Sequence, residues 1–210
     1  MDKIQQYLAE NWIDLLRLTY DHILMVVFGV ALAFIVGVPL GILCSRSKRL
    51  ASVILAVANV IQVIPSLALL VMIMILMGLG FKTVVVGLFL YSLLPIIRNT
   101  YVGLTGIDSS ITEAGTGVGM SPWQVLMKVQ FPLSLPFIMT GIRVAAVIAI
   151  GVAAMAPFVG GDGLGREIYS GINYRNNMRI LGGAIPAAML AVISDYLLGK
   201  LQKKVKLDKK

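Results

Sequence analysis

Long apolar runs alternate with short polar segments along this chain. Residues 23–45 contain no charged side chain, and a run of about 23 residues is enough for one helix across a hydrocarbon core about 30 Å thick. Comparable apolar runs cover about 52–78, 83–104, 134–159 and 179–199. The pattern therefore predicts an all-α membrane protein with about five transmembrane helices.

The second of these runs is too long for one straight span. Pro65 falls near its middle, in the sequence "IQVIPSLALL". A proline inside a helix removes one backbone hydrogen bond and clashes with the preceding turn. We therefore expect this span to be kinked or interrupted near Pro65.

The segments at the two ends of the chain differ from the spans. Apolar residues in the first twenty positions recur at a spacing that favours a helix lying on the outer membrane surface, namely Ile4, Leu8, Trp12, Leu15 and Leu16. This divides the chain into an interfacial helix over 1–18, a transmembrane domain over 19–199 and a basic cytoplasmic tail over 200–210.

Composition and charge agree with a membrane protein and set its orientation. Charged residues make up 13% of the chain, against about 25% in soluble domains. The net charge of +8 comes from clusters, with three basic residues in "RSKR" at 46–49 and six in the last eleven residues. Such clusters are typical of cytoplasmic loops rather than of a nucleic-acid-binding face. The N-terminus is then outside and the C-terminus inside.

One long cytoplasmic segment, at about 105–133, contains the stretch "EAGTGVGMSPWQVLMKVQFP". We expect a short helix from Ile111 to Gly119, ended by Gly119, and a second helix with Ser121 as N-cap and Pro122 in its first position. Pro132 and Pro136 would return the chain to the membrane. Because simple linkers are usually shorter, we interpret the segment as a compact helix–turn–helix.

This segment resembles the "EAA" loop of bacterial ABC importer permeases. The matching residues are Glu113, Ala114, Gly115, Gly119, Val129, Phe131 and Pro132. The five-span layout over residues 19–199 resembles the type I, methionine-importer-like permease fold. Three stretches, "IQVIPSLALL", "LLPIIRNTYVGL" and "GGDGLGREIYSGI", look most like permeases for glycine betaine, carnitine and choline.

The resemblance implies a mechanism and a set of partners. The segment would be a coupling helix in which Glu113, Ala114, Gly115 and Gly119 contact an ATP-binding subunit, and that subunit would carry ATP and Mg. It also implies a second permease chain, an extracytoplasmic substrate-binding protein, and a place among lipid in the bacterial cytoplasmic membrane. No cofactor is expected in this chain.

Other chemistries find little support in the residues. The sequence "GGDGLG" at 160–165 lacks the Lys-Ser/Thr of a phosphate-binding loop, and no nucleophile–base pair or metal-ligand motif indicates a catalytic residue or a metal site. Cys44 is the only cysteine, and His22 is expected to be a wet interfacial side chain. A secondary, ion-coupled transporter and a permease for another solute, such as an amino acid, stay open as alternatives.

Polar residues in the second span are candidates for the translocation path. Asn59, Gln62 and Ser66, with Pro65 beside Ser66, could line it. Side chains of this kind also form hydrogen bonds that only hold membrane helices together, so both interpretations stay open.

Three charged residues are predicted at similar depth near the cytoplasmic ends of the spans: Arg98, Arg143 and Asp195. An unpaired charge in lipid is costly, and the short Asp195 side chain cannot easily reach the interface. We therefore predict that Asp195 pairs with Arg143 or Arg98. Snorkelling to the interface is the alternative for the two arginines.

Overall fold

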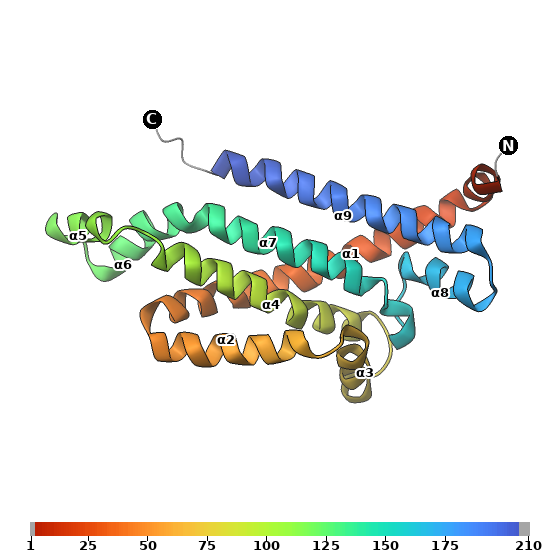
Figure 1. The fold of residues 1–210 in the computed structure, drawn as a ribbon, viewed down its shortest axis with the longest axis horizontal. Helices are drawn as coiled ribbons and strands as arrows, with labels where there is room; N and C mark the ends of the chain where they lie inside the picture. Colours follow the sequence, from red (N-terminus) through yellow and green to blue (C-terminus); the bar gives the residue numbers. More distant parts are fainter. Residues whose placement is uncertain (1–2, 206–210) are drawn as a thin grey trace.

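The computed structural model describes residues 3–205, which form a bundle of helices without strands in that range (Figure 1). Two short stretches depart from α-helical geometry, a π-helical turn at Leu126–Gln130 and a 3₁₀ turn at Ala156–Val159. The α-helices are α1 Lys3–Arg46, α2 Lys48–Val63, α3 Ser66–Met77, α4 Phe81–Thr105, α5 Ser109–Gly117, α6 Pro122–Val125, α7 Phe131–Ala153, α8 Gly165–Asn173 and α9 Asn177–Val205.

The predicted spans correspond to long apolar helices. Four helical stretches in the described residues are long and apolar enough to cross a membrane, in α1, in α4, from α6 through α7, and in α9. The bent pair α2 and α3 is a fifth if it counts as one broken span. The expectation of an all-α protein with about five spans is confirmed.

Helix α4 lies inside the bundle, packed against α1, α2 and α7 (Figure 1). Small residues on α1 allow the closest approach. A Cβ atom added at Gly41 would lie 2.5 Å from Cβ of Thr100 on α4, which leaves no room for any larger side chain. The buried core, which includes Leu88 and Ile96, is built on this contact between α1 and α4.

No break in the helix marks the boundary expected between an interfacial helix and the first span. The described part of residues 1–18 continues into the span as one helix, α1. The junction contains neither proline nor glycine, and Leu15 and Leu18 are buried at 7% and 4% exposure. Helical geometry therefore continues through the boundary expected at residue 18, and a surface position for these residues stays a prediction.

The interruption predicted near Pro65 is present, and it is sharp. Helices α2 and α3 meet at 98°. Pro65 has no N–H to continue the helix, and the Tyr91 hydroxyl of α4 donates a hydrogen bond to the Ile64 carbonyl at the break. The Ser66 hydroxyl donates to the Met155 sulfur at 3.2 Å. These two contacts hold α3 across the end of the bundle (Figure 1).

The return to the membrane differs from the expectation. Pro132 and Pro136 lie inside a continuous helical stretch from Pro122 to Ala153 instead of forming a turn. The Phe131 N–H bonds to the Leu126 carbonyl, as in a π-helical turn. This turn accommodates Pro132, which has no N–H of its own. The second helix of the 105–133 segment is therefore rigidly joined to α7.

The last two predicted spans also shift at their ends. Helix α7 ends at Ala153, before Pro157, rather than at 159. The glycine-rich loop contains the helix α8. Residues 200–205 of the expected tail extend α9, while residues 206–210 of that tail lie outside the described part of the chain.

Candidate functional site

The 105–133 segment forms a knob, made of α5 and α6, beyond the ends of α4 and α7 at one end of the bundle (Figure 1). Ser121 is the N-cap of α6, as predicted, because its hydroxyl accepts the Gln124 N–H at 3.3 Å and its own N–H donates to the Gln124 side chain at 2.8 Å. Gly119 has φ +86°, which reverses the chain between the two helices. The knob is therefore a locally capped unit.

The four residues expected to contact an ATP-binding subunit lie on different sides of the knob. Glu113, Ala114 and Gly119 are exposed, whereas Gly115 is buried. A Cβ atom at Gly115 would already lie 3.4 Å from Val125, so this glycine lets α5 pack on α6. Glu113, Ala114 and Gly119 are thus free to meet a partner, and Gly115 supports them from below.

Large apolar side chains surround these exposed residues. Val118 and Trp123 are 77% and 65% exposed. They lie outside the predicted spans, so lipid around the spans does not account for their exposure. Exposed apolar surface of this kind marks an interaction site. The knob therefore has the chemistry of a docking surface, with one carboxylate among apolar groups.

Of the candidate path residues, Asn59 and Gln62 lie in the second half of α2, Pro65 lies at the α2–α3 break and Ser66 begins α3. Asn59, Gln62 and Ser66 are half-buried, and Pro65 is exposed. The Asn59 side-chain oxygen accepts a hydrogen bond from Nη2 of Arg98 at 3.2 Å. The structure thus brings Asn59 and Arg98 together, a pairing that spacing along the sequence did not indicate.

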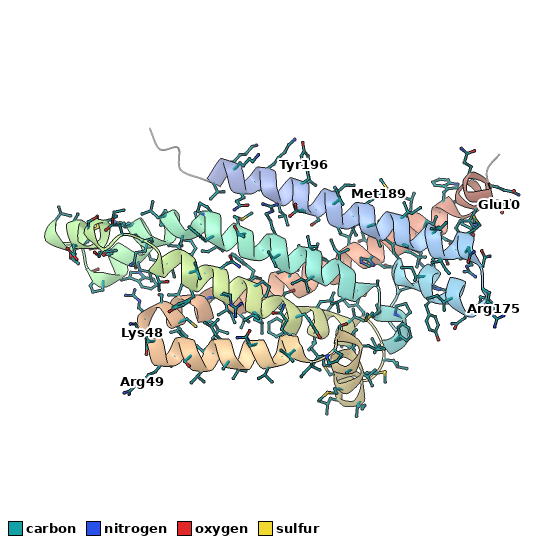
Figure 2. All side chains as sticks on the ribbon, in the orientation of Figure 1. Glu10, Lys48, Arg49, Arg175, Met189 and Tyr196 are labelled. Atoms are coloured by element: carbon teal, nitrogen blue, oxygen red, sulfur yellow. The ribbon has the colours of Figure 1, made fainter. Side chains whose placement is uncertain are left out.

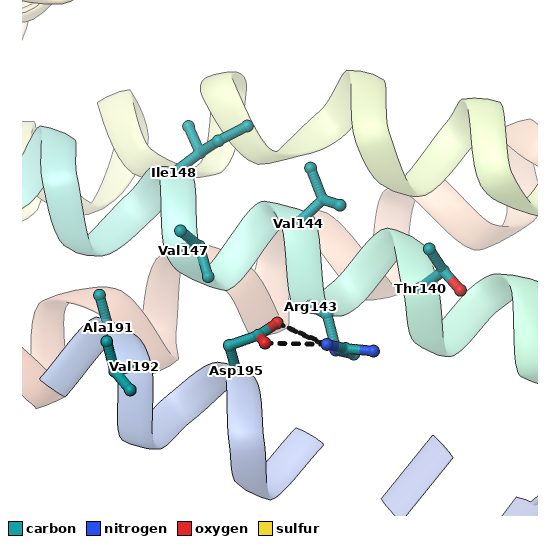
Figure 3. A pocket seen from close by; sticks show the side chains of 8 residues that line it. All are labelled: Thr140, Arg143, Val144, Val147, Ile148, Ala191, Val192 and Asp195. Atoms are coloured by element: carbon teal, nitrogen blue, oxygen red, sulfur yellow. Dashed lines mark hydrogen bonds and ion pairs between the residues drawn. The ribbon is translucent and has the colours of Figure 1, made fainter. Parts of the chain in front are cut away.

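The structure pairs Asp195 with Arg143 and not with Arg98 (Figure 3). Nη2 of Arg143 donates to both carboxylate oxygens at 2.8 Å, and Nε donates to Oδ1 at 3.0 Å. Nη1 of Arg143 donates to the Gln202 side chain at 2.8 Å, and Gln202 in turn donates to the Pro136 carbonyl at 2.9 Å and to Thr140 at 2.7 Å. This network joins α9 to the first turns of α7.

The pair is not enclosed by this chain. The side chains of Arg143 and Asp195 are 29% and 47% exposed. They line an open groove of about 570 Å³ between α7 and α9, together with Thr140, Val144, Val147, Ile148, Ala191 and Val192 (Figure 3). Apart from the ion pair and Thr140, the groove is apolar.

A second ion pair, at the opposite end of the bundle, went unnoticed in the sequence. Glu167 of α8 is 7% exposed and accepts two hydrogen bonds from Arg179 of α9, at 2.9 and 2.8 Å. The Tyr7 hydroxyl of α1 donates to the same carboxylate. The Arg179 guanidinium lowers the pKa of Glu167 below its usual range. Spacing along the sequence does not indicate this cluster, because Glu167 and Arg179 lie 12 residues apart on two different helices and Tyr7 lies 160 residues from Glu167.

His22 is buried rather than wet, which contradicts the expectation. Its side chain is fully buried, and Nε2 donates to the Ile150 carbonyl at 3.1 Å. That carbonyl lies where α7 ends, and the Ala154 N–H that would bond to it in a longer helix bonds to Val152 instead. His22 therefore caps the end of α7 from α1. Among the described residues, no group of potential metal ligands gathers around it or elsewhere.

Acid is expected to weaken the Glu167 cluster. Because the Arg179 guanidinium lowers the pKa of Glu167 on folding, the cluster stabilises the protein above the unfolded pKa, and this contribution is lost as pH falls through the lower pKa of the folded state. We expect Glu167→Gln to cost about 1–3 kcal/mol at neutral pH, and to flatten the acid side of the stability profile.

Thermal unfolding of the purified permease against pH measures this. The matched control is Glu113→Gln, which removes the same charge at an exposed site. A Glu167→Gln profile that parallels the wild type through the acid range would contradict the assignment.

Comparisons with known proteins agree with this arrangement. Residues 37–207 match the family described as "binding-protein-dependent transport system inner membrane component". The chain is 50% identical over 207 residues to the glycine betaine/carnitine/choline transport system permease protein OpuCD of Bacillus subtilis, covering 97% of this chain and 90% of that protein. It is 47% identical to the carnitine transport permease protein OpuCD of Listeria monocytogenes, covering 97% and 93%.

Solved structures support the same fold. The MetNI methionine ABC transporter in an inward-facing conformation matches with a TM-score of 0.82 at 21% identity, over 98% of this chain and 99% of that one. An amino acid ABC transporter with histidines matches with a TM-score of 0.74 at 17% identity, over 96% of each chain. With the expected type I permease fold confirmed and the family matched over most of its length, the chain belongs to the inner-membrane components of binding-protein-dependent ABC importers.

Proposed function

We propose that this chain forms the translocation path of an ATP-driven importer for a small quaternary-ammonium osmoprotectant, such as glycine betaine, carnitine or choline. The observation that carries the proposal is the 50% identity, over nearly all of both chains, to a permease named for these three solutes. The chain itself is not an enzyme, since its family supplies the membrane component and ATP is hydrolysed on a separate subunit.

The knob gives the proposal its mechanism. A subunit that binds ATP and Mg would hold α5 and α6 in a groove, with Glu113 meeting basic or amide groups there. Because α6 runs through the π-helical turn into α7 without a break, a movement of the knob would turn α7 as one body. A second permease chain would complete the path, and an extracytoplasmic substrate-binding protein would select the solute.

Uptake measured with the whole transporter tests the function. The chain is produced with its ATP-binding subunit and substrate-binding protein in cells that lack other osmoprotectant uptake. We expect accumulation of at least one labelled solute among glycine betaine, carnitine and choline, and its loss when the ATP-binding subunit is inactivated. Uptake that persists without ATP hydrolysis would support the ion-coupled alternative, and uptake of amino acids alone would support another solute class.

Labelling at two positions tests the proposed orientation. Single cysteines at Asp162, before α8, and at Lys204, near the end of α9, are expected to react from opposite sides of the membrane. An impermeant thiol reagent added to intact cells should label the first and spare the second. Cys44 is 1% exposed and interferes little, and Cys44→Ser removes it. Labelling of both positions from one side would contradict the orientation.

A further inference from the structure

Arg98 is a cation inside a membrane span without a carboxylate partner among the described residues. Its side chain is exposed, and the three ion pairs of the described chain use other arginines. Its one side-chain hydrogen bond goes from Nη2 to the neutral amide oxygen of Asn59 at 3.2 Å. A guanidinium has five N–H donors, so most of this group stays available to a ligand.

The side chain contacts α2 at Asn59, part of the way along the helix. Lys48, where α2 begins, lies at the same end of the bundle as the knob that follows Thr105 of α4 (Figures 1 and 2). At about 1.5 Å of rise per residue, Arg98 lies about 10 Å from that end and Asn59 about 16 Å from it. Helical side chains lean toward the N-terminus of their own helix, which for α4 is away from the knob. Bonding to Asn59 therefore keeps the guanidinium against α2 within the span, where it does not extend to that end as a snorkelling side chain would.

The polar neighbour of Arg98 lies on α2. Asn59 bonds to Arg98, and Gln62 follows about one turn later on α2; both are half-buried. Ser66 lies beyond the 98° bend and bonds to Met155 instead. Arg98 adds a fixed positive charge beside the neutral amide of Asn59. The complement of a planar guanidinium is a carboxylate, which it binds through two parallel hydrogen bonds.

We propose that Arg98 recognises the carboxylate of a zwitterionic osmoprotectant as the solute passes, so that the path favours glycine betaine and carnitine over choline. Glycine betaine and carnitine combine a trimethylammonium group with a carboxylate, whereas choline has a hydroxyl group in place of the carboxylate. A guanidinium in the path binds the carboxylate of a zwitterionic solute. Choline has no carboxylate, so the guanidinium would be left without a charged partner when choline passes. The inference rests on the proposed function.

The experiment compares uptake of the three labelled solutes by the complete transporter, at concentrations that saturate the substrate-binding protein. Arg98→Gln is expected to lower glycine betaine and carnitine uptake about tenfold relative to choline uptake. Asn59→Asp tests recognition of the solute carboxylate without removing the arginine, because the new carboxylate would pair with the Arg98 guanidinium. This variant should also lower glycine betaine and carnitine uptake relative to choline uptake. Arg49→Gln, at an exposed position near the start of α2, is the matched control and should leave the ratio unchanged.

The amount of each variant recovered from the membrane together with its ATP-binding subunit reports whether the transporter is assembled. Equal loss of all three solutes in an assembled transporter would overturn the inference and indicate a carboxylate on another chain or a purely structural role. An unchanged ratio in Arg98→Gln would overturn it as well. If Arg98→Gln fails to assemble, Arg98→Lys takes its place as the test. Glycine betaine and carnitine uptake should then fall relative to choline uptake, because lysine cannot bind a carboxylate through two parallel hydrogen bonds. A wild-type transporter that carries none of the three would instead refute the proposed function, before any variant is compared.

Discussion

Replacing Glu113 with lysine is expected to leave the permease folded in the membrane and to reduce ATP-driven uptake at least about tenfold. The side chain is exposed on α5 and forms none of the ion pairs of the described chain, so folding does not depend on it. A carboxylate bound to basic or amide groups of a partner contributes about 1.5–3 kcal/mol, and reversing its charge adds repulsion. Uptake and the amount of ATP-binding subunit that copurifies are the two measurements.

Two glycines in the knob provide matched tests of the same surface. A Cβ atom at Gly117 or at Gly119 would meet nothing within 4 Å in this chain. Gly119 has φ +86°, which disfavours other residues, whereas Gly117 lies in α5. Gly117→Ala is therefore expected to leave the chain folded, so any loss of uptake in it reports a partner backbone close to α5. Gly119→Asp should block uptake through its bulk, its charge and the strained turn.

The outcome for Glu113 separates coupling from folding. Wild-type uptake by Glu113→Lys would exclude this residue from the contact with the ATP-binding subunit. Loss of the protein from the membrane would instead assign it a role in folding, which its exposure argues against. Glu10→Lys, on the exposed N-terminal part of α1, is a control for charge reversal at the other end of the bundle (Figure 2).

Asp195→Asn is the second change with a large expected effect, and we expect it to destabilise the permease by about 1–3 kcal/mol. The carboxylate accepts three hydrogen bonds from Arg143, whereas asparagine would offer the guanidinium one neutral acceptor oxygen and an NH2 group in place of the second oxygen. Asn has the same shape, so the change tests charge rather than packing. Resistance of the purified protein to heat or to denaturing detergent measures the loss.

A double-mutant cycle identifies the partner. Asp195→Asn and Arg143→Gln together should cost less than the sum of the two single changes, whereas Asp195→Asn and Arg98→Gln should be additive. Coupling below about 0.5 kcal/mol with Arg143 would mean that water screens the half-exposed pair, and would remove its role in holding α9. Coupling with Arg98 would contradict the observed geometry.

The position of the pair links it to the knob. Gln202 binds the Pro136 carbonyl and Thr140 in the first turns of α7, and α7 is continuous with α6. The C-terminal half of α9 would therefore follow α7 when the knob moves. A loose α9 in Asp195→Asn should lower uptake more than it lowers ATP hydrolysis, which distinguishes this effect from the loss of contact expected for Glu113→Lys.

Local features of the sequence were sufficient to predict the spans, the proline break and the caps of the knob. Each of these depends on residues next to one another: the length of an apolar run, a Pro65 without an N–H, or a Ser121 followed by Pro122 and Gln124. The continuity of α1 past residue 18 follows from the same kind of local feature, because no glycine or proline interrupts the helix there.

The contacts between distant residues depend on packing. Sequence spacing left Asp195 with two possible arginines, and the approach of α9 to α7 selects Arg143 while α2 presents Asn59 to Arg98. His22 caps α7 from 128 positions away, and Tyr7 reaches Glu167 from 160 positions away. The 98° angle at Pro65 likewise depends on Tyr91 and Met155. A proline removes one hydrogen bond, but the direction in which the chain continues is chosen by the groups that satisfy the freed carbonyl.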